Sequence, residues 1–226
     1  MGEAAGATVD VPTLDGIADA YLAHPDDGAA HPGVLFYMDA FGVRPRLRQM
    51  ADRLAAAGYT VLVPNVLYRH DRAPLVELPE RIEEQDRPAL LASSPQATDG
   101  SVGVTGYCMG AGLALRTAGT YPHRVAAAGG FHGAGLASDA PDSPHLLAEG
   151  ITADLYFAHA DQDPAMPPEQ IDRLDKALTA AGVRHDTEVY AGAQHGYTMA
   201  DTTRYNADAT ERHWTALLDL FGRTLS

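Results

Sequence analysis

The sequence predicts an α/β fold in which helices cover both faces of a mostly parallel sheet. Three apolar runs, at residues 34–38, 60–63 and 102–104, have the continuous hydrophobicity of strands that are buried on both faces. An amphipathic helical pattern at 47–55 lies between the first two runs, and a strand–helix–strand order implies a parallel sheet. The length fits one domain spanning residues 1–226.

The other elements of this sheet follow in chain order. Alternating residues at 8–11 and 17–22 flank Asp15-Gly16, which predicts a hairpin at a sheet edge. Further strands are predicted at 125–128, 155–158 and 187–190, with one helix beginning after Pro167-Pro168 and a last helix whose apolar stripe is Thr210, Trp214, Leu217, Leu218 and Phe221. Residues 136–150 are expected to form a loop.

Composition excludes several classes of protein. A net charge of −14, from 30 acidic and 16 basic residues, argues against a nucleic-acid partner. The single cysteine excludes an intramolecular disulfide framework. No apolar run approaches the length of a membrane span and no signal peptide is visible, so we expect a cytoplasmic protein with no membrane partner.

Cofactor and metal patterns are weak. The glycines around residue 110 do not form the G-x-G-x-x-G pattern of dinucleotide-binding proteins. The run His159-x-Asp161-x-Asp163 lacks further spaced ligands. We therefore expect neither a cofactor nor a metal.

Cys108 is the residue around which the sequence is organised. It lies at the centre of Gly106-Tyr107-Cys108-Met109-Gly110, after a β-branched stretch and before a run of small residues. This is the G-x-nucleophile-x-G elbow of α/β-hydrolases, with sulfur in place of the usual serine oxygen. The flanking glycines permit a sharp strand-to-helix turn. The alternative is a buried structural cysteine near a helix start.

Two further residues complete a nucleophile–acid–histidine order. Asp163 and His195 each follow a predicted strand, so the fold can bring them to Cys108 at one edge of the sheet. His195 would take the thiol proton, and Asp163 would orient the imidazole. Asp161 competes with Asp163 for that role. The oxyanion hole would use the N–H of Met109 and one from the loop at 39–41, that of Ala40.

The chain contains ten histidines, so the position of each one matters more than its presence. His132 and His159 also follow or end predicted strands. We interpret them as residues that line a pocket or have satisfied hydrogen bonds, rather than as catalysts.

With these residues identified, the chain resembles the dienelactone hydrolase family of small, largely lidless α/β-hydrolases. The resemblance covers nearly the whole chain and rests on the elbow, the Asp163 loop, Gln194-His195-Gly196 and Phe41-Gly42. It implies a Cys–His–Asp triad that acts on lactones and esters. Family members usually have a glutamate, which takes the proton of the resting thiol, where this chain has the shorter Asp39.

The resemblance also bears on the substrate. Dienelactone-specific members place an arginine that binds the substrate carboxylate four residues after the histidine, where this chain has Met199. A thioether cannot replace a bidentate cation, so a neutral ester or lactone is expected. The residues expected to contact it are Phe41, Tyr107, His132 and Met199. Substitute cations would be Arg69, Arg72, Arg81 and Arg87.

The sequence therefore predicts a cysteine-dependent hydrolase of carboxylic esters or lactones. The alternatives are a thiol redox enzyme that uses Cys108, which would lack a resolving cysteine, and a non-catalytic interaction protein on a hydrolase scaffold. Residues 69–100 have room for about one short helix, predicted at 78–85. A sheet face left uncovered there would favour a homodimer with two-fold symmetry.

Overall fold

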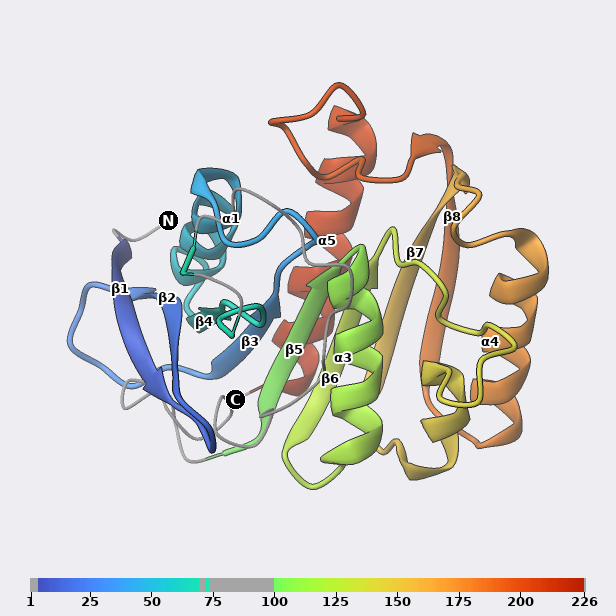
Figure 1. Cartoon of the computed structure of the whole chain (residues 1–226), viewed down its shortest axis with the longest axis horizontal. Coiled ribbons are helices and arrows are strands. Elements are labelled where there is room, and N and C mark those ends of the chain that lie inside the picture. Colours follow the sequence, from blue (N-terminus) through green and yellow to red (C-terminus); the bar gives the residue numbers. More distant parts are fainter. Residues whose placement is uncertain (1–3, 70–71, 74–99, 226) are drawn as a thin grey trace. The chain divides into compact units, whose positions relative to one another are not determined.

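A computed structural model describes residues 4–69, 72–73 and 100–225. The chain comprises two compact units, Met1–Val102 and Gly103–Ser226, whose elements Figure 1 labels. The single domain expected over residues 1–226 stays a prediction. The predicted helix at 78–85 lies outside the described residues.

The first unit begins with the predicted hairpin. Strands β1 (Ala4–Pro12) and β2 (Ile17–Pro25) pair antiparallel, and the N–H of Thr13 donates to the carbonyl of Gly16 to close the turn. The strand order in this unit is β1-β2-β4-β3, so β1 forms an edge, as predicted.

Two buried strands and one helix complete the first unit. Strands β3 (Gly33–Tyr37) and β4 (Thr60–Pro64) are parallel and buried at every residue, as their continuous hydrophobicity indicated. Helix α1 (Pro45–Ala55) joins them and buries its apolar stripe. Gly58 follows this helix with φ +100°, a left-handed conformation that suits glycine at a helix end.

The second unit contains four strands in the order β5-β6-β7-β8. They are β5 (Val102–Tyr107), β6 (Val125–Phe131), β7 (Asp154–Gln162) and β8 (His185–Gln194). Strand β7 is parallel to both of its neighbours. Strands β5, β7 and β8 end immediately before or at the loops that carry Cys108, Asp163 and His195. Parallel strands present their carboxyl ends at the same edge of a sheet, which is how these loops can come together.

Helices cover both faces of these four strands. Helix α3 (Met109–Thr120) lies on one face and α5 (Ala207–Thr224) on the other (Figure 1). The approach of α5 is close: a Cβ on Gly129 of β6 would come within 2.9 Å of Leu217. Helix α4 (Pro168–Ala180) packs near the outer strand β8. The α/β class predicted from the sequence is confirmed.

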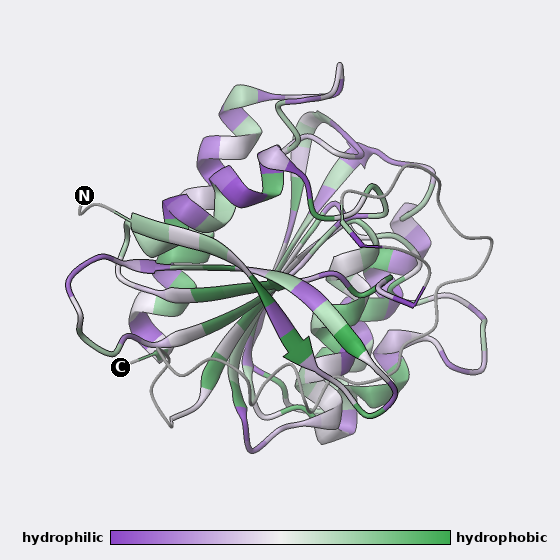
Figure 2. Cartoon of the chain, turned by 60° about the vertical axis from the view of Figure 1, so that its left-hand side comes forward, coloured by the Kyte–Doolittle hydropathy of each residue, from purple (hydrophilic) through white to green (hydrophobic). Residues whose placement is uncertain are grey.

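One local expectation was incomplete. Within the stretch expected to be a loop, residues Pro144–Gly150 form a short 3₁₀ helix, η1, that packs against both α3 and α4. The proline at its first turn and its short apolar run are compatible with helix, but they carry no helical period to detect. Figure 2 shows hydrophobic residues concentrated along the strands and hydrophilic residues on the outward faces of the helices.

Candidate active site

The elbow at Cys108 has the strained turn that its glycines predict. Cys108 lies between β5 and α3 with φ 55° and ψ −117°, a backbone conformation that non-glycine residues rarely adopt. Its N–H donates to the carbonyl of Phe131 at the end of β6. A Cβ on Gly106 would lie 1.9 Å from the carbonyl oxygen of Gly110, so the turn requires glycine at that position.

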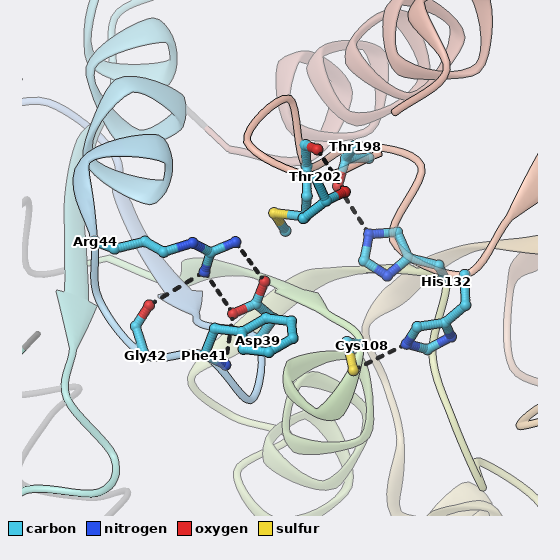
Figure 3. Close-up of polar contacts among 10 residues, drawn as sticks. Asp39, Phe41, Gly42, Arg44, Cys108, His132, Thr198 and Thr202 are labelled. Atoms are coloured by element: carbon cyan, nitrogen blue, oxygen red, sulfur yellow. Dashed lines mark hydrogen bonds and ion pairs between the residues drawn. The ribbon is translucent and has the colours of Figure 1, made fainter. Parts of the chain in front are cut away.

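Cys108, His195 and Asp163 lie in contact, in the order that the sequence predicts. The Nε2 atom of His195 is 3.0 Å from the Cys108 sulfur, a contact that Figure 3 draws from the labelled Cys108. The Nδ1 atom of the same imidazole is 2.6 Å from Oδ2 of Asp163. The other oxygen of Asp163 accepts from the N–H of Ala165. The carboxylate therefore orients the ring so that Nε2 faces the thiol.

The two candidate acids make different contacts in the structure. Asp163 is buried and binds His195. Asp161 is exposed, and its carboxylate accepts from the N–H of Gly192 at 2.8 Å. Asp161 thus ties the end of β7 to β8, whereas Asp163 faces the imidazole.

His195 is a strong base in this setting. Burial of the ring lowers its pKa, but the hydrogen bonds to Asp163 and Cys108, together with their negative charges, outweigh burial and raise the pKa to about 10. The imidazole therefore holds a proton readily at neutral pH. That property suits a group that takes a proton from a thiol and later returns it to a leaving group.

The oxyanion-hole candidate Met109 is the first residue of α3. The first N–H groups of a helix have no partner within the helix, and they carry the positive end of its dipole. Met109 directly follows Cys108, the position that an oxyanion donor takes in such an elbow, and its role there stays a prediction.

The predicted substrate contacts in the second unit are buried side chains. Tyr107 is fully buried, and its hydroxyl is 2.8 Å from Nε2 of His213 in α5. Because Nδ1 of His213 faces the carbonyl of Thr210, we assign the proton there, so that Tyr107 donates to Nε2. Met199 is 2% exposed. Their contact with a substrate stays a prediction.

The two additional histidines differ from each other. His132 is fully buried, and its Nε2 is 2.8 Å from Oγ1 of Thr198 (Figure 3). His159 is also buried, and neither of its ring nitrogens has a hydrogen-bond partner among the described residues. Burial lowers the pKa of His159 to about 4 against the opposing charge of Asp163, so this ring is neutral. Within the part of the chain that the structure describes, His159 is thus not the satisfied hydrogen-bonder that was one of its two predicted roles.

In the first unit, Asp39 follows β3 and is held by an arginine that sequence analysis missed. Both oxygens of Asp39 accept from Arg44, at 2.7 and 3.0 Å, and Oδ1 also accepts from the N–H of Phe41. Phe41 is 58% exposed, with the Arg44 guanidinium 5.6 Å from its ring centre. The only feature of the sequence that could have indicated this ion pair was a basic residue five positions after Asp39. The roles predicted for Asp39, Ala40 and Phe41 at Cys108 stay predictions.

Of the substitute cations, two lie in the described residues. Arg69 forms an ion pair with Asp15, and Arg72 forms one with Asp10. Arg81 and Arg87 lie outside the described residues. Across the ranges that the structure describes, no cluster of side chains could hold a metal ion. In those same ranges, no helix has the length and hydropathy that crossing a bilayer requires.

A cavity of about 450 Å³ lies beside α4 and β8. Asp163 lines it, together with Met166, Ile171, Thr187 and Val189. Neither Cys108 nor His195 is among its lining residues. The cavity therefore borders Asp163 but not the Cys108 sulfur, and a group attacked by Cys108 would not occupy it.

Comparison with known proteins identifies the family of the chain and similar folds. A profile described as the Dienelactone hydrolase family matches residues 18–225. A Synechocystis sp. protein provisionally named carboxymethylenebutenolidase is 30% identical, covering 89% of each chain. The carboxymethylenebutenolidase of Rhodococcus opacus is 27% identical, over 91% of this chain and 86% of its own. The crystal structure of a Klebsiella pneumoniae protein provisionally titled dienelactone hydrolase superimposes with a TM-score of 0.86 at 20% identity, covering 97% of this chain and 99% of that one.

Proposed function

Because the chain belongs to the dienelactone hydrolase family, we propose that it hydrolyses carboxylic esters or lactones through a thioester formed on Cys108. The observation that carries the proposal is the continuous contact from Asp163 through His195 to the Cys108 sulfur. A free thiol at a strand-to-helix elbow, beside an oriented base, is the arrangement of an activated nucleophile.

The chemistry proceeds in two steps. The thiol proton passes to Nε2 of His195, and the resulting thiolate attacks the carbonyl carbon of the substrate. The tetrahedral oxyanion is stabilised by the N–H of Met109 and, in the predicted arrangement, by that of Ala40. The carbon–oxygen bond to the leaving group then breaks, and His195 returns the proton to the departing alkoxide.

The second step releases the acid product. His195 removes a proton from water, and the resulting hydroxide attacks the thioester carbonyl. The carbon–sulfur bond breaks and the thiolate recovers its proton from the imidazolium. In both steps Asp163 holds the ring through Nδ1 and stabilises the imidazolium. Its buried carboxylate, which the Ala165 N–H also binds, suits this role.

We further propose that the substrate is neutral. Met199, rather than a cation, stands four residues after His195, and the net charge of −14 opposes the approach of an anion. An unpaired carboxylate in a partly apolar pocket would cost about 1–3 kcal/mol, roughly a tenfold to hundredfold loss in binding. The expected readout is a higher kcat/KM for neutral esters and lactones than for cis-dienelactone.

The direct test uses a chromogenic short-chain ester with wild type, Cys108→Ala and wild type alkylated with iodoacetamide. We expect turnover in wild type only, and a thioester adduct on Cys108 in rapidly quenched mass spectra. Activity of Cys108→Ala equal to wild type would refute the proposal. Consumption of peroxide with an external thiol, without ester turnover, would support the redox alternative instead. The homodimer stays a prediction, and light scattering tests it.

A further inference from the structure

His132 occupies an unusual place at the end of β6. Its φ is 40°, in the left-handed region that histidine enters more readily than most residues. Its N–H donates to the carbonyl of Ala158 on β7, and its ring is fully buried. A strained backbone and a buried polar ring both cost stability, so their coexistence calls for a compensating role.

The ring connects β6 to the loop that carries His195. Nε2 of His132 is 2.8 Å from Oγ1 of Thr198, and Thr198 lies three residues after His195 in the same loop (Figure 3). The rings of His132 and His195 also meet edge to face, with centroids 5.4 Å apart at 67°. His132 thus contacts the proposed base directly and holds its loop through a hydroxyl.

The surroundings keep His132 neutral. Burial, followed by the charges of His195 and His213, lowers its pKa well below the usual value. A neutral imidazole can stand against the protonated His195 without repulsion. Nδ1 of His132 has no hydrogen-bond partner among the described residues. An orphaned N–H would be costly, so we assign the proton to Nε2, which then donates to Thr198.

We propose that His132 is a positioning residue for His195: its hydrogen bond to Thr198 fixes the loop so that Nε2 of His195 stays in reach of the Cys108 sulfur. The inference rests on the proposed function of that pair. The full burial of His132 favours this role over direct contact with a substrate, which was its predicted role. A shift of about 1 Å in a reacting group can cost roughly a hundredfold in rate, so the anchoring of this loop matters for the chemistry.

Alkylation of Cys108 tests the proposal without any substrate. Cys108 is the only cysteine, so iodoacetamide uptake reports this thiol alone, and only the thiolate reacts. At neutral pH the thiolate forms by transfer of the proton to His195. At strongly alkaline pH hydroxide removes the proton, and His195 is not needed. The ratio of the two alkylation rates therefore measures how well His195 is placed.

Two substitutions at Thr198 separate the hydrogen bond from packing. Thr198→Val keeps the shape but removes the hydroxyl, whereas Thr198→Ser keeps the hydroxyl but removes a methyl group. We expect Thr198→Val to lower the neutral-pH rate about tenfold, a part of the 10²–10⁴ that a positioned base contributes, while leaving the alkaline rate unchanged. Thr198→Ser should resemble wild type. A wild-type rate in Thr198→Val, or an equal loss in Thr198→Ser, would overturn the proposal.

Further variants guard against misfolding and misassignment. His132→Asn suits the left-handed backbone but is too short to reach Thr198, so it should reproduce the loss seen in Thr198→Val; a wild-type profile would overturn the proposal. Thr117→Val, in which the buried hydroxyl that donates to Leu113 within α3 is lost, is the matched control and should alkylate as wild type.

His195→Ala distinguishes failure of this inference from failure of the proposed function. If His195→Ala leaves the neutral-pH rate unchanged, the thiol–imidazole pair itself is refuted, and the positioning role with it. If His195→Ala lowers that rate but Thr198→Val and His132→Asn do not, only the positioning role fails.

Discussion

The imidazole of His195 lies 3.0 Å from the sulfur of Cys108, although 87 residues separate them in the chain. The elbow turns the thiol outward from the end of β5, and the loop after β8 brings the base to it. Both residues belong to the unit Gly103–Ser226. The first three predictions concern this pair, the aspartate that binds His195 and the glycines near the elbow.

Replacing Asp163 should disable the base, whereas replacing Asp161 should not. In Asp163→Asn the amide no longer stabilises the imidazolium, and it can favour the wrong tautomer, so ester turnover should fall by about 10²–10⁴. In the matched control Asp161→Asn the amide oxygen can still accept from Gly192, and the change should stay near twofold, as for exposed substitutions. Steady-state kcat/KM measures both. A larger loss in Asp161→Asn would reverse the assignment.

The pKa of His195 should fall when the thiol is removed. Hydrogen bonding and charge from Cys108 are among the causes that raise it to about 10, and Cys108→Ala removes both while Asp163 remains. Because the folded-state pKa is raised, protonation of His195 stabilises the fold below its unfolded pKa of about 6.5 and that contribution is lost as the pH rises through about 10. NMR titration of the imidazole checks the shift. An unchanged or higher value in Cys108→Ala would contradict it.

Two glycines near the elbow should respond oppositely to alanine. At Gly106 the added methyl would lie 1.9 Å from a backbone oxygen, so Gly106→Ala should lower the free energy of unfolding by about 1–3 kcal/mol and distort the elbow. At Gly112, within α3, the nearest atoms would be 3.8 Å away. Gly112→Ala should therefore raise that free energy by roughly 0.5–1 kcal/mol. Urea denaturation measures both. Equal effects would show that the close contact at Gly106 is relieved at little cost.

The ion pair between Asp39 and Arg44 should stabilise the first unit. Their side chains are 3% and 14% exposed, and Arg44→Ala would leave a buried carboxylate without its guanidinium. The free energy of unfolding should fall by about 3–5 kcal/mol. The exposed pair Arg72–Asp10 supplies the control, since Arg72→Ala removes an ion pair that water and salt already screen and should leave the free energy of unfolding close to that of wild type. An equal loss of unfolding free energy in both variants would show that the burial of Asp39 does not increase the contribution of its ion pair to stability.

The sequence alone determined the α/β class, the position of the elbow at Cys108 and the loops that carry Asp163 and His195. Each depends on local pattern: apolar runs mark buried strands, and glycines on both sides of Cys108 mark a turn that a side chain at Gly106 would obstruct. The place of His195 followed from topology, because parallel strands deliver their following loops to one edge.

Only the tertiary structure decided which polar groups meet. Asp161 and Asp163 are two aspartates only two positions apart in the sequence, and the contact of Asp163 with an imidazole 32 residues away distinguishes them. The pairing of His132 with Thr198 spans 66 residues, and that of Asp39 with Arg44 depends on how the chain turns after β3. Hydrogen bonds between distant side chains leave no periodicity in a sequence, because they depend on the direction of each side chain after the strands have packed.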